Sequence, residues 1–244
     1  MVDGPVPKYY DEGLRSAREI VPIVLEVIRP ASVIDVGCGE GNWLAVFREY
    51  GIGDIFGVDL HYRAELLRIP NDRFTVHDLT EPLRLNRTFE LVVCLEVAEH
   101  LPQSCAFPLI ESLTNLGPVV LFSAAIPFQG GTGHMNEQWL DYWANLFRQR
   151  GYQPIDYIRP KIWDNERILW WYVQNILMFA REDYIASNRA LRSAYETPAR
   201  YPLSLVHPRV YLGKARPNTV GELAGELLKT IQLRIEGWLT EMGR

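Results

Sequence analysis

The sequence predicts an α/β protein built on a doubly wound sheet of about seven strands, mostly parallel with an antiparallel edge. Three observations support this fold class. Short apolar runs alternate with amphipathic stretches over residues 11–150, as in chains of repeated strand–helix units. The runs at 89–95 and 119–125 are almost wholly apolar, which is typical of parallel strands buried on both faces. A glycine-rich turn follows the first run, at residues 37–41.

The first two thirds of the chain supply the parallel part of this sheet. A helix is expected over residues 11–29, because its apolar residues recur at helical spacing, with a kink at Pro22. Five strands are then expected, at residues 32–36, 54–60, 73–78, 89–95 and 119–125. Further helices are expected at residues 42–50, 107–116 and 136–150.

The pattern changes after residue 151. Residues 153–158 and 169–180 are interpreted as two more strands, and the second of these is rich in aromatic and β-branched side chains. Such a pair would complete the sheet as its antiparallel edge. We therefore expect one domain over residues 1–180, followed by a helical C-terminal extension over residues 181–244.

The extension ends in an expected helix that begins at Thr219-x-x-Glu222, a capping-box pattern. Its apolar stripe runs from Val220 to Trp238. The stripe either packs on the protein's own domain or forms a contact in a homodimer.

Composition excludes several classes of protein. The net charge of −5 and the pI near 5.6 argue against nucleic acid or an anionic membrane surface as the main partner. The three cysteines, Cys38, Cys94 and Cys105, form no C-x-x-C pair, which excludes a zinc knuckle. Residues 1–10 lack the basic start and apolar run of a leader sequence, so a cytoplasmic location is expected.

The segment VIDVGCGEGNW, Val33 to Trp43, carries the chemical information. Glycines after a buried strand allow a tight turn and a close approach of the backbone to a ligand. The third glycine comes one residue earlier than in the dinucleotide fingerprint, giving G-x-G-x-G. Asp35 adds a carboxylate, which disfavours a pyrophosphate and favours a sulfonium or amino group.

Carboxylates follow at the ends of the next strands. Asp59 ends the second strand, Asp78 the third and Glu96 the fourth. The carboxyl ends of parallel strands meet at one edge of the sheet, so we expect these side chains to face one crevice.

The order of these motifs resembles that of the class I S-adenosylmethionine-dependent methyltransferases. The motifs are Asp35-x-Gly37-x-Gly39-x-Gly41, Asp59, His77-Asp78 and then CLEVAEHLP at residues 94–102. The resemblance covers about residues 10–180. It is strongest to the small-molecule branch that includes ubiquinone-type and sugar O-methyltransferases. It implies a Rossmann-like fold and S-adenosyl-L-methionine as the cofactor.

The resemblance also implies roles for single residues. Asp35, Gly37 and Gly39 would line the methionine moiety, Asp59 would hold the ribose hydroxyls, and Asp78 would face the adenine. The full set of expected cofactor-binding residues is Asp35, Gly37, Cys38, Gly39, Asp59, Leu60, Asp78, Leu79 and Glu96. The alternative for each carboxylate is that it caps the following helix.

The loop PFQGGTGHMNEQW, residues 127–139, follows the fifth strand and is expected to face the acceptor. His134 is a candidate general base, because an imidazole titrates near neutral pH. Glu137 or Asn136 would orient it. Alternatively, Asn136 caps the next helix and His134 only braces the loop. His100 is the second candidate base, if it does not merely contact a neighbouring loop.

The predicted function is transfer of a methyl group to a small-molecule acceptor, favoured as a hydroxyl of a sugar or natural product. The alternatives are N-methylation of an amine or peptide, and a cofactor-binding partner protein without catalysis. No nucleic-acid or membrane partner is expected.

No closely spaced set of Asp, Glu and His points to a metal site, although a divalent ion held by Asp59 or His134 remains an alternative. Some members of a set of aromatic residues are expected to line the acceptor pocket: Trp163, Trp170, Trp171 and Tyr172.

Overall fold

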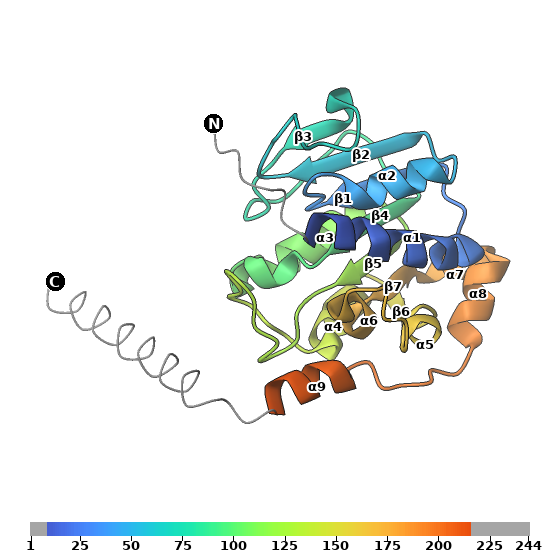
Figure 1. The fold of residues 1–244 in the computed structure, drawn as a ribbon. Helices are drawn as coiled ribbons and strands as arrows, with labels where there is room; N and C mark the ends of the chain where they lie inside the picture. The colour runs from blue at the N-terminus through green and yellow to red at the C-terminus, as the bar shows by residue number, and fades with distance from the viewer. Residues whose placement is uncertain (1–8, 216–244) are drawn as a thin grey trace, which may run out of the picture. The chain divides into compact units, whose positions relative to one another are not determined.

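The computed structural model describes residues 9–215 and contains a sheet of seven strands in the order β3-β2-β1-β4-β5-β7-β6 (Figure 1). The strands are β1 (Ser32–Val36), β2 (Asp54–Asp59), β3 (Phe74–Val76), β4 (Leu91–Leu95), β5 (Val119–Ser123), β6 (Tyr152–Ile155) and β7 (Leu177–Arg181). The first five strands are parallel, and β7 runs antiparallel to both β5 and β6. The predicted fold class, including its antiparallel edge, is confirmed.

Helices cover both faces of the sheet, because successive strand residues point to opposite faces. They are α1 (Tyr9–Val27), α2 (Asn42–Glu49), α3 (Ala106–Leu116), α4 (Leu140–Gln149), α5 (Arg159–Ile162), α6 (Trp170–Asn175), α7 (Glu182–Ser187) and α8 (Arg189–Glu196). In β4, Leu91 and Val93 pack into one apolar cluster with α1, α2 and α8, whereas Val92 packs into a second cluster with α3 and α4. This two-sided burial explains the continuous apolar runs of the central strands.

Two predicted elements differ in the structure. The strand expected over residues 169–180 is divided into helix α6 and strand β7. The sequence WWYV has high β propensity, but in the helical conformation the fully buried Gln174 and Asn175 form hydrogen bonds with Gln129 and Glu96. Helix α4 begins at Leu140 instead of residue 136, because the backbone of Asn136 and Gln138 is bound to Glu99 and Ala125.

The first compact unit reaches His207, not residue 180. Helices α7 and α8 belong to it, and their side chains Ile185 and Leu191 are buried in the same cluster as α1. The fully buried Arg159 also donates hydrogen bonds to the carbonyls of Pro202 (3.2 Å) and Leu203 (2.8 Å). Residues 181–207 are therefore part of the sheet domain rather than of an extension.

A second unit begins at Pro208 and contains the described helix α9 (Pro208–Ala215). The expected helix from Thr219 and the apolar stripe from Val220 to Trp238 lie outside the described residues. The role of this stripe in a homodimer stays a prediction. Among the helices of residues 9–215, none has the length and apolar character needed to cross a membrane.

Candidate active site

A cleft of about 690 Å³ opens at the carboxyl ends of β1, β2 and β4. It is lined by Gly37, Asp59, Leu60, His61, Asp78, Leu79, Glu96, Val97, His100 and Leu101. Six of the nine residues expected to bind the cofactor therefore meet in this cleft. Ligands of open α/β sheets bind at this edge, outside the carboxyl ends of the strands.

The glycine turn after β1 forms one wall of the cleft. A Cβ atom on Gly37 would lie 2.3 Å from Val97 Cγ2, so only glycine fits there. Gly39 has a φ of 54°, and a Cβ atom added to it would meet nothing within 4 Å. Its N–H donates to Asp59 Oδ2 at 2.8 Å, which ties the turn to the end of β2. The open space over Gly39 is what a ligand lying against the backbone requires.

Asp35 lies behind this turn, with 2% of its surface exposed. Its Oδ2 atom has no hydrogen-bond partner within the described part of the chain. Burial, and then the nearby Asp59 carboxylate, hold the pKa of Asp35 well above its usual range. A ligand with a positive charge, such as the sulfonium and amino groups of S-adenosylmethionine, would supply the charge that this site lacks.

Cys38 is buried beside Asp35 instead of lining the cleft. Its Sγ atom points to the sheet, where a Cβ on Gly57 would lie 2.8 Å from it. Burial raises the pKa of the Cys38 thiol, which keeps it protonated. Cys38 thus supports the turn from below, and the expectation that it binds the cofactor gains no support from its position.

Asp59 and Asp78 organise the loops that follow their strands. Asp59 Oδ1 accepts a hydrogen bond from the His61 N–H at 3.1 Å. Asp78 Oδ1 accepts from the N–H and the hydroxyl of Thr80, at 2.9 and 2.8 Å, and these bonds lower the pKa of Asp78. Neither residue precedes a helix, so the alternative in which they cap helices does not apply. Both side chains line the cleft.

A second cavity, of about 580 Å³, adjoins the first. Its lining includes Glu99, Gln129, His134, Trp170, Trp171 and Tyr172. Glu96 and His100 line both cavities and so form their common wall. A donor in the first cavity and an acceptor in the second would meet at this wall. Trp170, Trp171 and Tyr172 line this second cavity, whereas Trp163 packs on Tyr201 and His207.

Glu96 is held at the common wall in a strained conformation. Its φ is 55°, a left-handed value that non-glycine residues adopt mainly at functional sites. Asn175 Nδ2 donates to Glu96 Oε1 at 3.3 Å and to Gln129 Oε1 at 3.0 Å. Burial raises the pKa of Glu96, and hydrogen bonds from Ser123 and Asn175 partly offset this effect.

His134 and Glu137 form a pair in the loop after β5, as predicted. His134 Nδ1 lies 2.9 Å from Glu137 Oε1, and the same oxygen accepts the Gly130 N–H at 2.7 Å. The carboxylate fixes the proton on Nδ1, so the lone pair of the neutral ring is on Nε2. A Cβ on Gly131 would lie 2.2 Å from Nε2, so glycine is needed there to make room for the ring.

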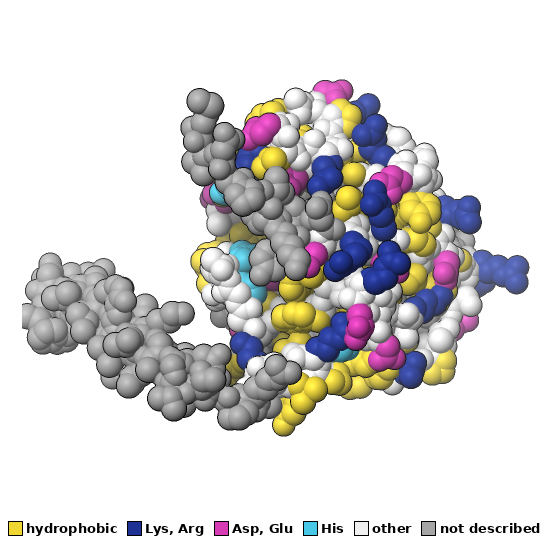
Figure 2. All heavy atoms as spheres, viewed as in Figure 1, with side chains coloured by type: hydrophobic (Ala, Val, Ile, Leu, Met, Phe, Trp, Pro, Cys, Tyr) yellow, Lys and Arg dark blue, Asp and Glu magenta, His cyan; other side chains and the backbone are white. Residues whose placement is uncertain are grey.

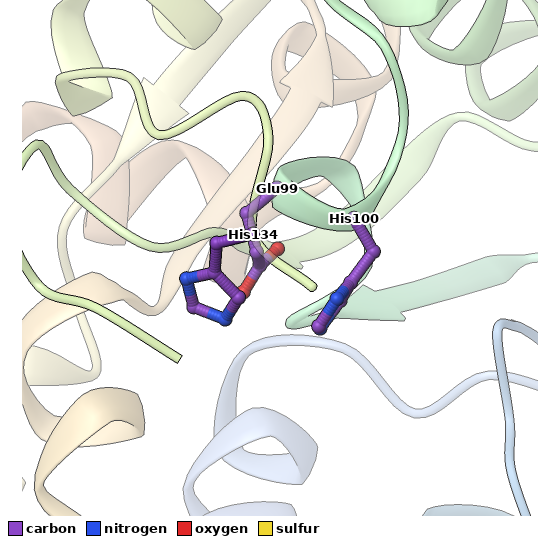
Figure 3. Close-up of side chains that lie close together, drawn as sticks. All are labelled: Glu99, His100 and His134. Carbon is purple, nitrogen blue, oxygen red and sulfur yellow. The ribbon is translucent and has the colours of Figure 1, made fainter. Parts of the chain in front are cut away.

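Glu99 completes a cluster that the sequence reasoning missed. Ligand atoms of Glu99, His100 and His134 lie within 4.8 Å of one another, with the two rings beside the carboxylate (Figure 3). The expectation that no such cluster exists must therefore be corrected. Glu96, Glu99 and His100 stand close together in one segment, and a lone histidine in the next loop completes the pattern. This sequence pattern could have indicated the cluster.

The loop reaches this cluster because it is bound to the backbone of Glu99. The N–H groups of Met135 and Asn136 donate to the Glu99 carbonyl, at 2.8 and 3.1 Å. Asn136 does not cap α4, whose N-cap residue is Trp139. The Glu99 side chain itself is fully buried, and burial together with the Glu96 charge raises its pKa to about 9.

The remaining histidines take no part in the cluster. His61 is exposed at the rim of the first cleft. His207 is buried, its N–H donates to Gln174 Oε1 at 2.9 Å, and its ring nitrogen Nε2 lies 3.0 Å from the Trp163 carbonyl. It therefore holds the end of the first unit in place and does not line the second cavity.

Comparisons with known proteins agree with this site. A family model described as a methyltransferase domain matches residues 10–158, more than half of the chain. The fold is similar to magnesium protoporphyrin IX methyltransferase (ChlM) from Synechocystis PCC 6803, crystallised with SAH, at a TM-score of 0.53 and 18% identity over 74% of this chain and 90% of that one.

Two other solved structures are similar at lower coverage of their own length. An O-methyltransferase family protein from Burkholderia thailandensis gives a TM-score of 0.52 at 15% identity, over 71% of this chain and 58% of that chain. Small RNA methyltransferase HEN1 gives 0.50 at 17% identity, over 75% and 26%. No curated protein matches by sequence. The family match, the glycine turn and the acidic cleft lead to one conclusion: the chain belongs to the methyltransferase-domain family and is an S-adenosylmethionine-dependent methyltransferase.

Proposed function

We propose that the enzyme methylates a hydroxyl group of an uncharged small molecule of the sugar or natural-product type. The observation that carries this proposal is the His134–Glu137 pair, which faces the second cavity. A hydroxyl acceptor, unlike a neutral amine, must lose a proton during the transfer, and groups that promote this loss lie where the acceptor would bind.

The transfer balances in one step. The acceptor oxygen forms a bond to the methyl carbon, and the carbon–sulfur bond breaks with its electron pair left on sulfur, which gives S-adenosylhomocysteine. The hydroxyl proton passes to Nε2 of His134, whose Nδ1 faces Glu137, and the ring later releases it to water. The protein's main task is to align donor and acceptor across the wall formed by Glu96 and His100.

The charge of the two cavities argues against an acceptor with negative charge. No lysine or arginine among the described residues lines either cavity. In the view of Figure 2, most lysine and arginine side chains lie over the right-hand part of the molecule. Enzymes that bind nucleic acids neutralise phosphates with lysine and arginine, so this lining favours a small neutral acceptor over RNA.

The aromatic wall supports an acceptor with a ring. Trp170 and Trp171 meet edge to face, with centroids 5.3 Å apart, on the same side of the cavity as Tyr172. Such side chains present flat apolar faces to sugar or aromatic rings.

A release assay for S-adenosylhomocysteine tests the proposal, with sugars, phenols, amines, peptides and a short RNA as acceptors. We expect turnover with one or more hydroxylated small molecules and strong dependence on His134. Turnover confined to amines or peptides, and unaffected by His134→Ala, would establish the N-methylation alternative instead. Binding of S-adenosylhomocysteine without turnover of any acceptor would favour a partner protein that has lost catalysis.

A further inference from the structure

Glu99, His100 and His134 present one carboxylate and two imidazoles to a common point beside the acceptor cavity (Figure 3). Glu99 and His100 come from the turn after β4, and His134 comes from the loop after β5. The two imidazole rings lie edge to face, with centroids 4.8 Å apart. One carboxylate and two imidazole nitrogens at such short distances can serve as the ligands of a divalent transition-metal ion.

The spacing of the cluster fits such an ion. The ligand atoms lie within 4.8 Å of one another. Two ligands on opposite sides of an ion, with bonds of about 2.1 Å, lie about 4.2 Å apart. Small side-chain rotations of the exposed His100 and the partly buried His134 would bring the ligand atoms to these distances without a change in the backbone.

Glu99 offers such an ion a buried carboxylate. Its side chain is completely buried, and neither carboxylate oxygen has a hydrogen-bond partner within residues 9–215. Buried carboxylates that lack partners are costly, and in proteins they carry a proton, pair with a cation or coordinate a metal. No lysine or arginine of the described chain lines the cavity to play that part.

The surroundings of His134 resemble those of a metal ligand. Its Nδ1 is engaged by Glu137, and Glu137 is in turn fixed by the Gly130 N–H. A carboxylate on one ring nitrogen orients the other nitrogen and raises its basicity, which is the usual support of metal-bound histidine.

We propose that Glu99, His100 and His134 bind one divalent cation that in turn binds the acceptor hydroxyl. This inference rests on the proposed hydroxyl acceptor and deepens it. Two nitrogen donors favour a first-row transition ion over Mg²⁺, which prefers oxygen ligands throughout. Three protein ligands leave coordination positions open toward the cavity.

With this cation in place, His134 is a metal ligand and not a general base. A hydroxyl bound to a divalent ion loses its proton more readily, and the proton passes to water in the open cavity. The resulting oxygen then attacks the methyl carbon as described above. Glu137 becomes a positioning residue, because it acts through the His134 ring.

The test measures metal binding directly on the full chain. The protein is freed of metals with a chelator, loaded with S-adenosylhomocysteine and titrated with Mn²⁺, which is followed by the loss of free-ion electron paramagnetic resonance signal. Mg²⁺ is titrated in competition. The variants are Glu99→Gln, Glu137→Gln and, as a matched control, Glu65→Gln, an exposed glutamate outside both cavities.

We expect one Mn²⁺ per wild-type chain, displaced by Mg²⁺ only at large excess. Glu137→Gln should weaken binding roughly 10- to 100-fold, the usual cost of an outer-sphere partner. Glu99→Gln should weaken it more, and Glu65→Gln should leave it unchanged. Folding is checked by S-adenosylhomocysteine affinity, which all variants should retain.

Absence of stoichiometric binding to the folded wild type would overturn the proposal, and so would wild-type affinity in Glu99→Gln. Full turnover of a hydroxyl acceptor by the chelated enzyme would also overturn it, while leaving the proposed function intact. Conversely, Mn²⁺ bound by Glu99 in an enzyme that methylates only amines would refute the hydroxyl acceptor and keep the metal site.

Discussion

The two cavities of this methyltransferase are assembled in different ways. The first is formed by the ends of neighbouring strands and the turns directly after them, so each of its residues is placed by local chain geometry. The second draws on α1, the turn after β4, the loop after β5 and helix α6. The first cavity therefore depends on short-range geometry, and the second depends on tertiary contacts. Substitutions on the two sides should separate cofactor binding from turnover.

The largest effect is expected on the acceptor side, from His134→Ala. The variant loses the side chain that promotes removal of the hydroxyl proton, whether as a base or as a metal ligand. We expect kcat to fall roughly 100- to 10,000-fold. S-adenosylhomocysteine affinity, measured by calorimetry, should barely change. A parallel His100→Ala variant shows which of the two rings matters more, and a fall of only a few-fold in both would exclude a histidine role.

The next effect is expected on the donor side, from Gly39→Val. The added branched side chain projects into open space over the turn, where the cofactor should lie, and Gly39 has a left-handed φ of 54°. We expect a folded protein whose melting temperature no longer rises with S-adenosylhomocysteine, since only a bound ligand stabilises the folded state. Gly53→Val, in a loop where an added Cβ also meets nothing, is the matched control and should retain the shift.

A smaller donor-side effect is expected from Asp59→Ala. Hydrogen bonds that ribose hydroxyls donate to a carboxylate contribute about 1.5–3 kcal/mol, or roughly 10- to 150-fold in affinity. Part of the loss comes from the turn, because Asp59 also accepts the Gly39 N–H. At saturating cofactor, kcat should recover to near the wild-type value. A low kcat that persists at saturation would show that the two cavities are not separable at this residue.

The smallest effect is expected from Asn175→Ala, which removes one hydrogen bond from Glu96 at the common wall. We expect kcat to fall roughly tenfold, in line with about 1.5 kcal/mol for a bond to a charged group. Asn175→Asp replaces the donor by a second carboxylate and should be worse than Ala. Equal activity of both variants and wild type would mean that Glu96 is held in place by the backbone alone.

The same contrast explains what could be predicted from the sequence. The glycine turn, Asp59, Asp78 and Glu96 were predictable because each follows its strand directly and parallel strands bring their ends together. The His134–Glu137 pair was predictable because it lies within one loop.

Glu99 was not found, because its role depends on a histidine that another loop carries to it through the Glu99 carbonyl. Helix α6 was mistaken for a strand, because the propensity of WWYV is local, whereas the buried amides of Gln174 and Asn175 bond to distant partners. The domain boundary was placed too early for a similar reason, since Arg159 binds Pro202 and Leu203 far along the chain.

One contact within the second cavity bears on how such an enzyme changes its acceptor. The side-chain oxygen of Gln129, in the loop after β5, accepts hydrogen bonds from Gln174 and Asn175 in α6, at 3.1 and 3.0 Å. Exchange of the loop alone, in a laboratory chimera or by recombination, would remove one hydrogen-bond acceptor from each of these two buried amides. The loop at residues 126–138 and the helix at residues 170–175 should therefore be exchanged together when the acceptor specificity is changed. The residues of the first cavity can stay as they are.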